Sequence, residues 1–186
     1  MHPRTTEVLS YLEAQHAVLE QAIAAIPPAY HAKRPAPDRW SIAEVLAHVA
    51  IVEHFIVQLL RAKLEAARAR GLGPERDTSP VVRTFDIDRV HDRSRRVEAV
   101  PEVFPPADAD ATAAMKSIAE AHGALRALIA SVDGLSLGEV SAPNPVLGPL
   151  NVYQWVAFLG GHEARHVGQI MEAARELGAP IEVTAS

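Results

Sequence analysis

The hydrophobic positions of this chain recur at spacings of three and four residues, which is the period of an α-helix with one buried face. Four segments show this period clearly, and we expect amphipathic helices at residues 6–26, 41–71, 108–132 and 151–177. The inward-facing positions of the first segment illustrate the pattern: Val8, Leu12, His16, Leu19, Ile23 and Ile26. Four amphipathic helices of this length predict an all-α four-helix bundle.

Residues with known preferences for helix ends bound these segments. Pro27 and Pro28 follow the first segment, and proline cannot continue the helical hydrogen-bond ladder. Ser41 with Glu44 three residues later is the signature of a capping box at the start of the second helix. Glu44 is therefore interpreted as a capping acid rather than a metal ligand. The third helix is expected to begin near residue 108 or 110.

The segment between the second and third helices, residues 72–107, carries several prolines and no sustained period. A connection of this length is uncommon inside a compact domain. We expect it to cross the length of the bundle, so that the third helix runs parallel to the second; residues 84–87 could at most form a short extended piece. The proline-rich stretch at 143–149 is expected to be a loop. We find no repeat and expect one domain over residues 1–186.

Composition and charge remove several functional classes. The 186 residues are 48% hydrophobic and 22% charged, as in a globular domain, and the net charge of -5 argues against a nucleic-acid-binding or anionic-membrane surface. Without cysteine, disulfides, thiolate catalysis and cysteine-rich zinc sites are excluded, which leaves histidine, carboxylate or water as metal ligands. Charges break the apolar runs before about 18 residues, so we expect no membrane span. With no signal-peptide pattern at the start, a cytoplasmic location is the default expectation.

The nine histidines carry the main chemical signal. His16, His122, His162 and His166 fall within apolar stripes, and His48 flanks the stripe of the second helix. His162 and His166 are spaced i, i+4, so they project from one helix face with Cβ atoms about 5–6 Å apart and can chelate one divalent ion. If the second and third helices are parallel, all five histidines lie at a similar depth in the bundle. His48, His162 and His166 can then converge on one ion.

Each of these interpretations has a plainer alternative. The three converging residues could be hydrogen-bonded core histidines without a metal. His122 is a candidate catalytic base or ligand-orienting residue, and His16 a candidate lining residue of the same pocket; simple core packing is the alternative for both. Glu163 follows a candidate ligand and points about 100° away from it, so we expect it to be exposed or to contact a ligand rather than the metal. His54 is expected to be solvated.

Two further polar features could serve the site or the surface. Gln169 lies one helical turn beyond His166 and could orient that imidazole or simply pack. The basic residues Arg93, Arg95 and Arg96 are interpreted as a solvated run, with the binding of an anionic cosubstrate as the alternative.

Two blocks of this sequence carry a family resemblance: residues 40–50, WSIAEVLAHVA, and residues 161–170, GHEARHVGQI. They resemble the DinB-like family of four-helix-bundle metalloproteins, and the order of elements agrees over nearly the whole chain. The resemblance implies a divalent metal, usually zinc or nickel, held by one histidine on the second helix and an H-x3-H pair on the fourth. These positions match His48, His162 and His166, with water completing the metal shell.

The same resemblance carries expectations about activity. The family includes thiol-dependent S-transferases and a maleylpyruvate isomerase, which use low-molecular-weight thiols. It therefore implies a metal-dependent transferase that activates such a thiol and acts on a small-molecule substrate. A metal-dependent hydrolase is one alternative, and a non-catalytic, metal-stabilised stress-response or interaction module is another. A fourth protein ligand, such as His122 or His16, would favour the non-catalytic alternative. Because family members commonly pair through their helices, we expect a homodimer.

Overall fold

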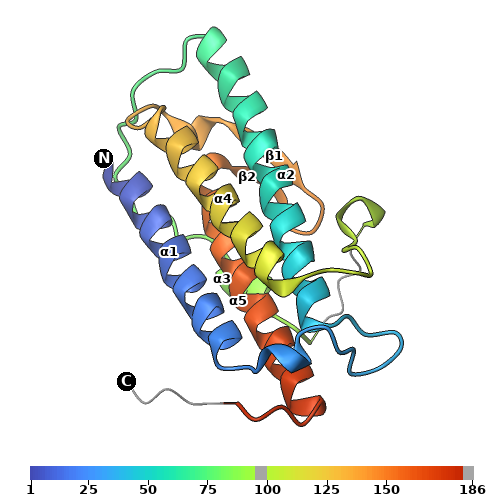
Figure 1. The fold of residues 1–186 in the computed structure, drawn as a ribbon. Coiled ribbons are helices and arrows are strands. Elements are labelled where there is room, and N and C mark those ends of the chain that lie inside the picture. The colour runs from blue at the N-terminus through green and yellow to red at the C-terminus, as the bar shows by residue number, and fades with distance from the viewer. Residues whose placement is uncertain (95–99, 182–186) are drawn as a thin grey trace.

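The computed structural model describes residues 1–94 and 100–181 of the chain. Four long helices form its body (Figure 1): α1 (Pro3–Ala24), α2 (Ile42–Ala69), α4 (Ala111–Ala130) and α5 (Val152–Glu176). The predicted all-α four-helix bundle is confirmed. The long apolar stripes located the helices well, since every observed end lies within three residues of the expected one.

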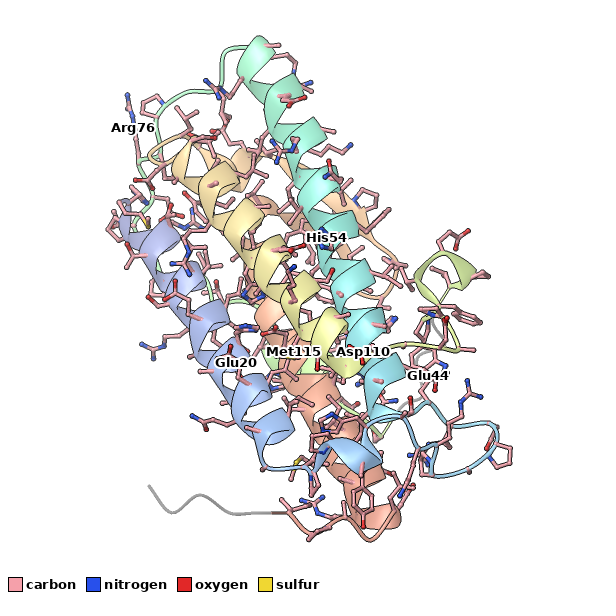
Figure 2. All side chains as sticks on the ribbon, in the orientation of Figure 1. Glu20, Glu44, His54, Arg76, Asp110 and Met115 are labelled. Atoms are coloured by element: carbon pink, nitrogen blue, oxygen red, sulfur yellow. The ribbon has the colours of Figure 1, made fainter. Side chains whose placement is uncertain are left out.

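The helices α2 and α4 run in the same direction, as the long connection between them predicts (Figure 1). They begin at the same end of the bundle, where Figure 2 labels Glu44 on α2 and Asp110 at the N-cap of α4. Beyond their other ends, the backbone of residues 73–75 is hydrogen-bonded to the backbone of residues 134–136. The remaining pair, α1 and α5, runs the opposite way.

Capping boxes fix the first turns of α2 and α5. The Ser41 hydroxyl accepts a hydrogen bond from the backbone N–H of Glu44 at 3.2 Å, and the Glu44 carboxylate accepts from the backbone N–H of Ser41 at 2.7 Å. Arg34 also donates to this carboxylate. Glu44 is thus a capping acid, as predicted. Asn151 and Gln154 form the equivalent box on α5, so both helices that carry candidate metal ligands have well-defined starts.

The connection between α2 and α4 includes the short helix α3 (Ile87–His91) and the 3-10 turn η2 (Pro101–Val103). The sequence suggested at most an extended piece near residues 84–87, but Asp86 caps a helical turn by accepting from the backbone N–H of Arg89. This helix packs against α5 where Gly161 leaves room for it. A Cβ at Gly161 would lie only 2.7 Å from Cδ1 of Ile87.

The stretch before α5 is a small hairpin rather than the predicted loop. Strands β1 (Ser141–Asn144) and β2 (Gly148–Asn151) pair antiparallel, with Pro143 opposite Pro149. Both strands are sheet edges, where a missing N–H is tolerated. The Asn144 side chain accepts hydrogen bonds from two backbone N–H groups of the turn at 2.9 Å each, and Gly148 has a φ of 82°. The prolines suggested a loop, but the hairpin forms because Asn144 holds its turn and the prolines occupy edge strands.

The apolar core is divided into two clusters along the bundle. On α1 one cluster stops at Leu12 and the other starts at Leu19; on α5 one stops at Leu159 and the other resumes at Ile170. The bundle therefore contains a layer of buried and partly buried polar side chains between the clusters. Its members on the four helices are His16, Glu53, His122, His162, Glu163 and His166.

Among the described residues one helix, α2, is long and apolar enough to cross a membrane by length and composition alone. Its most apolar 18-residue window has a mean hydropathy of 1.6, and 61% of that window is buried inside the bundle. A core helix of a water-soluble bundle passes the same test. The expected absence of a membrane span stays a prediction.

Candidate metal centre

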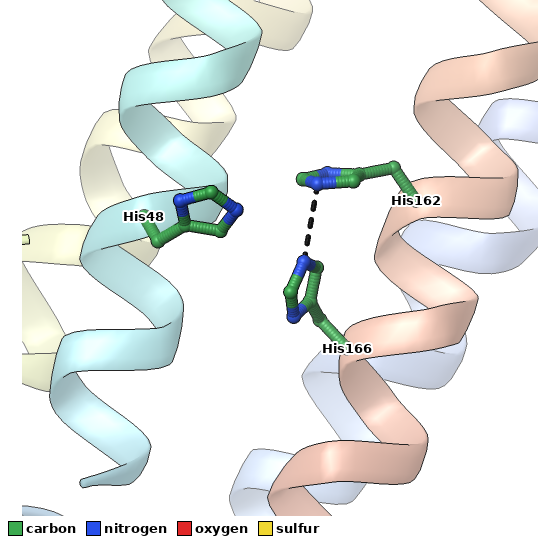
Figure 3. Close-up of side chains that lie close together, drawn as sticks. All are labelled: His48, His162 and His166. Carbon is green, nitrogen blue, oxygen red and sulfur yellow. Dashed lines mark hydrogen bonds between the residues drawn. The ribbon is translucent and has the colours of Figure 1, made fainter. Parts of the chain in front are cut away.

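Three histidines from two helices meet between α2 and α5 (Figure 3). One ring nitrogen from each of His48, His162 and His166 lies within 4.8 Å of the other two. The Nε2 atoms of His162 and His166 are 3.1 Å apart. The His48 ring faces this pair from α2, with centroid distances of 5.4 and 5.0 Å. The fold thus brings together the three residues that the sequence analysis selected as metal ligands.

Hydrogen bonds at the far ring nitrogens orient two of these imidazoles. Nδ1 of His48 donates to the backbone carbonyl of Val103 at 2.8 Å, which leaves Nε2 with its lone pair. Nδ1 of His166 lies 2.9 Å from Oε1 of Gln169 and donates to it. Gln169 therefore orients a candidate ligand rather than only packing. Partners of this kind fix the tautomer and orientation of metal-binding histidines.

The His162 ring supports a cation between the three nitrogens. Its Nδ1 is buried and has no hydrogen-bond partner among the described residues. A hydrogen bond from Nε2 of His162 to Nε2 of His166 would leave that Nδ1 as an unpartnered buried acceptor. With the proton on Nδ1 instead, the Nε2 lone pairs of both rings face each other at 3.1 Å. A metal ion satisfies these lone pairs, so the donor set fits one.

Electrostatics keep the three imidazoles neutral. Burial and the neighbouring His48 lower the pKa of His166 to about 3. Burial also lowers the pKa of His162 well below its usual value, and it lowers that of His48 against the opposing hydrogen bond to Val103. Because metal ions bind the neutral ring, no proton has to leave these residues at neutral pH.

Aromatic rings border the three-histidine group. Phe158, one turn before His162 on α5, stacks on that imidazole with ring centroids 5.6 Å apart. On the other side Trp40 lies 5.2 Å from His48 and 6.1 Å from Phe104. Such apolar walls lower the local dielectric and strengthen charge–dipole interactions inside the site.

No fourth side chain closes the group in the part of the chain that the structure describes. Its members are the three histidines alone, without an aspartate, glutamate or further histidine at comparable distance. Catalytic zinc sites characteristically have three protein ligands and a position left for water or substrate, whereas structural sites have four protein ligands. The geometry therefore corresponds to an open site.

The structure places His16 and His122 in a second group rather than beside the three histidines. Nδ1 of His16 is 3.0 Å from Oε1 of Glu163, and the rings of His16 and His122 lie 4.3 Å apart. Nε2 of His122 is 3.2 Å from Oε2 of Glu53 and 3.4 Å from Oε1 of Glu163. The two groups occupy different faces of α5, because successive helical residues are rotated by about 100°. The catalytic roles expected for His16 and His122 stay predictions.

Charge dominates this second group. Glu163 is fully buried rather than exposed, and Glu53 is 1% exposed. Burial tends to lower the pKa of His122, but the two carboxylates outweigh it and raise that pKa to about 10. Burial also raises the pKa of Glu53 to about 7. The protonation state of each carboxylate and imidazole in this group therefore depends strongly on the charges of its neighbours.

Comparison with known proteins places the chain in a family. The sequence profile of the DinB superfamily matches residues 11–170. The chain belongs to the DinB superfamily. The chain is also 27% identical over 146 residues to the uncharacterized protein YuaE of Bacillus subtilis (strain 168), and the matched region spans 78% of this chain and 83% of YuaE.

A solved structure shares the fold of this DinB-superfamily chain. It is YfiT from Bacillus subtilis, described as a probable metal-dependent hydrolase with an unusual four-helix bundle topology. The TM-score is 0.56 at 15% sequence identity, with 94% of this chain and 87% of YfiT covered. At this identity the likeness establishes the fold alone.

The remaining polar residues of this DinB-superfamily chain differ from expectation in informative ways. His54 is half-buried rather than solvated, and its Nε2 lies 3.0 Å from the hydroxyl of Ser117 on α4. Arg93 pairs with Glu172 of α5, whereas residues 95 and 96 lie outside the described residues. Glu53 is a buried site residue that was not predicted from the sequence. A signal was available, since Glu53 lies within the spacing of the apolar stripe of α2.

Proposed function

We propose that this chain is a metal-dependent enzyme, and within that class a hydrolase, whose three-histidine group holds one divalent ion. The observation that carries the proposal is the convergence of three neutral ring nitrogens with no fourth protein ligand among the described residues. When bound there, such an ion supplies a Lewis acid that polarises an oxygen of the substrate and lowers the pKa of a coordinated water. We propose zinc or nickel, because three imidazoles suit both.

The protein's own residues have distinct tasks in this proposal. His48, His162 and His166 bind the ion through Nε2, and the Val103 carbonyl and Gln169 side chain hold two of these rings in place. Phe158 and Trp40 exclude water from two sides. No residue of the group carries a compensating negative charge, so the charge of the ion stays available to act on substrate.

Support for the hydrolase comes from the likeness to YfiT, whose description as a probable metal-dependent hydrolase agrees with an open metal position. The thiol-dependent transferase expected from the sequence blocks is the competing assignment for the same position. Because the chain has no cysteine, any thiolate that reaches the metal must come from a cosubstrate. This property makes the two assignments separable by experiment.

The metal assignment is tested by elemental analysis of protein purified without chelator or affinity-tag metal. His166→Ala should lower the metal content by one ion per chain and abolish hydrolysis across a panel of ester, amide and phosphoester substrates. His54→Gln, on α2 but outside the group, is the matched control and should keep both. Unchanged metal content and hydrolysis in His166→Ala would overturn the proposal.

The choice between hydrolase and transferase is tested with cobalt(II)-substituted protein and small thiols. The hydrolase predicts turnover that needs no thiol, and a thiol that binds cobalt at the open position should inhibit this turnover. A sulfur-to-cobalt charge-transfer band, together with turnover that requires a thiol, would replace the hydrolase by the transferase.

A further inference from the structure

The polar layer of the bundle contains a second set of buried side chains that the proposed function does not use. Each long helix contributes one residue: His16 from α1, Glu53 from α2, His122 from α4 and Glu163 from α5. We propose that these four residues form a second metal site, which holds a divalent transition-metal ion through two imidazole nitrogens and two carboxylate oxygens. Facing helices of four-helix bundles build metal sites in this way. The inference is independent of the three-histidine centre.

Three contacts between the proposed donor atoms have lengths close to those found around a metal ion, and His16, His122 and Glu163 each place a donor atom within 4.8 Å of the other two. Nδ1 of His16 and Nε2 of His122 lie 3.0 and 3.4 Å from Oε1 of Glu163, and Nε2 of His122 lies 3.2 Å from Oε2 of Glu53. Around a tetrahedral ion with ligands at about 2.0–2.1 Å, neighbouring donor atoms are about 3.3–3.4 Å apart. These three contacts need shifts of only a few tenths of an ångström, whereas Glu53, which contacts His122 but lies outside the compact group of His16, His122 and Glu163, has to move closer to complete the shell.

Several polar atoms in this group lack the hydrogen bonds that burial demands. Both carboxylate oxygens of Glu53, Oε2 of Glu163 and Nε2 of His122 are buried and have no hydrogen-bond partner among the described residues. The contacts of His122 with the two carboxylates are close but lack hydrogen-bond alignment. An unsatisfied buried charge is costly. Protons on His122 and Glu53 can cancel both carboxylate charges but leave these atoms without aligned partners, whereas a divalent ion would cancel the charges and also give the oxygens a partner.

An opening leads from the surface to this group. A surface cavity of about 310 Å³ has His16 and His122 among its lining residues. Glu13 and Glu20 also line it; Glu13 pairs with Arg126, and Glu20 lies 3.7 Å from Nε2 of His16. Acidic side chains at a cavity mouth raise the local cation concentration. A metal ion can thus approach His16 and His122 from a cavity that none of the three histidines of the first group lines.

The test uses cobalt(II) alone as the probe, added to metal-free full-length protein. The wild type should bind two ions per chain, and His48→Ala/His166→Ala should still bind one, with the visible absorption of four-coordinate cobalt. Adding Glu53→Gln to that double variant should remove this ion, because the amide cannot supply the carboxylate charge. Adding His54→Gln instead is the matched control on α2 and should leave it bound.

The possible outcomes separate this site from the three-histidine centre. One ion in the wild type and none in the double variant would overturn the second site, as would cobalt binding that Glu53→Gln does not change. One ion that survives in the double variant and is lost with Glu53→Gln would support the second site and overturn the three-histidine centre. Should Glu53→Gln unfold, judged by circular dichroism, His16→Gln at the cavity edge should weaken the remaining cobalt binding about tenfold or more.

Discussion

Two groups of polar side chains lie against the same turn of α5, and they have opposite electrostatic character. His162 belongs to the three-histidine group, while Glu163, the next residue, belongs to the second group, which we call the histidine–glutamate group and which consists of His16, Glu53, His122 and Glu163. In the first, burial and neighbouring rings lower the pKa of His166 to about 3. In the second, burial is outweighed by two carboxylates, which raise the pKa of His122 to about 10. One helix therefore presents a neutral donor set on one face and a charged one on another.

The difference implies different tasks. Neutral donors leave the charge of a bound ion available to polarise substrate and water, whereas two carboxylates neutralise most of that charge. We therefore expect activity to depend on the three-histidine group and stability to depend more on the histidine–glutamate group.

The largest expected effect on stability is that of Glu163→Ala. In metal-free protein this change leaves His122 and His16 without the carboxylate that contacts both, and breaking a buried charged cluster costs about 3–5 kcal/mol. His166→Ala should lower the free energy of unfolding by less, because it removes a neutral ring. Urea denaturation followed by circular dichroism measures both. Equal losses in the two variants would contradict the electrostatic contrast between the groups.

The two groups should also give metal-free protein opposite dependences on pH. The folded-state pKa of His166, about 3, lies below the usual 6.5, so the unfolded state binds more protons and stability falls as the pH drops from 6.5 toward 3. The folded-state pKa of His122, about 10, lies above 6.5, so its contribution is complete below 6.5 and is lost as the pH rises toward 10. Glu53, with its pKa raised to about 7, acts in the same sense as His122 and loses its contribution between about 4.5 and 7.

Variants separate these contributions in unfolding experiments between pH 4 and 10, a range chosen to span roughly the titrations above. Replacing His166 by alanine should flatten the acid limb of the stability curve, and replacing His122 by glutamine should flatten the alkaline limb. If either substitution flattened both limbs, the two groups would titrate as one unit.

A smaller effect is expected from Gln169→Leu, which removes the partner of His166 Nδ1 and touches no donor of the second group. Loss of such an orienting hydrogen bond typically weakens metal binding about 10–100-fold. Competition with a chromophoric chelator should show this loss for one ion only. A change in the affinity of both ions would mean that the two sites are coupled through α5.

The helices could be predicted from the sequence because their apolar stripes are long and their ends carry caps such as Ser41 and Asn151. The parallel arrangement of α2 and α4 followed from the length of the connection. The hairpin was missed because it depends on a single turn held by Asn144, and its prolines indicate a loop when composition alone is considered. The period of the apolar residues thus predicts the four long helices, whereas contacts within a single turn leave no periodic pattern in the sequence.

The candidate sites, too, could be predicted from the sequence only in part. The i, i+4 spacing pointed to His162 and His166, and helix direction added His48. The separation of His16 and His122 from these residues was not foreseen, because depth along a bundle does not fix the side of a helix. Glu163 lies four residues after Leu159 and seven before Ile170, both buried. An acid at this spacing within an apolar stripe is a usable signal of a buried charge.

The smallest expected change in stability is that of His54→Gln. The behaviour of this control variant decides how the results of the other variants are interpreted. His54 lies next to Glu53 on α2, and its Nε2 contacts the hydroxyl and carbonyl of Ser117 on α4 at 3.0 and 3.1 Å. Losing one such hydrogen bond costs about 1 kcal/mol, so the free energy of unfolding should fall by that amount or less while both cobalt ions stay bound. If this variant lost an ion, loosening of the α2–α4 contact would be sufficient to release metal. The losses expected for Glu53→Gln would then reflect packing between helices rather than a missing ligand.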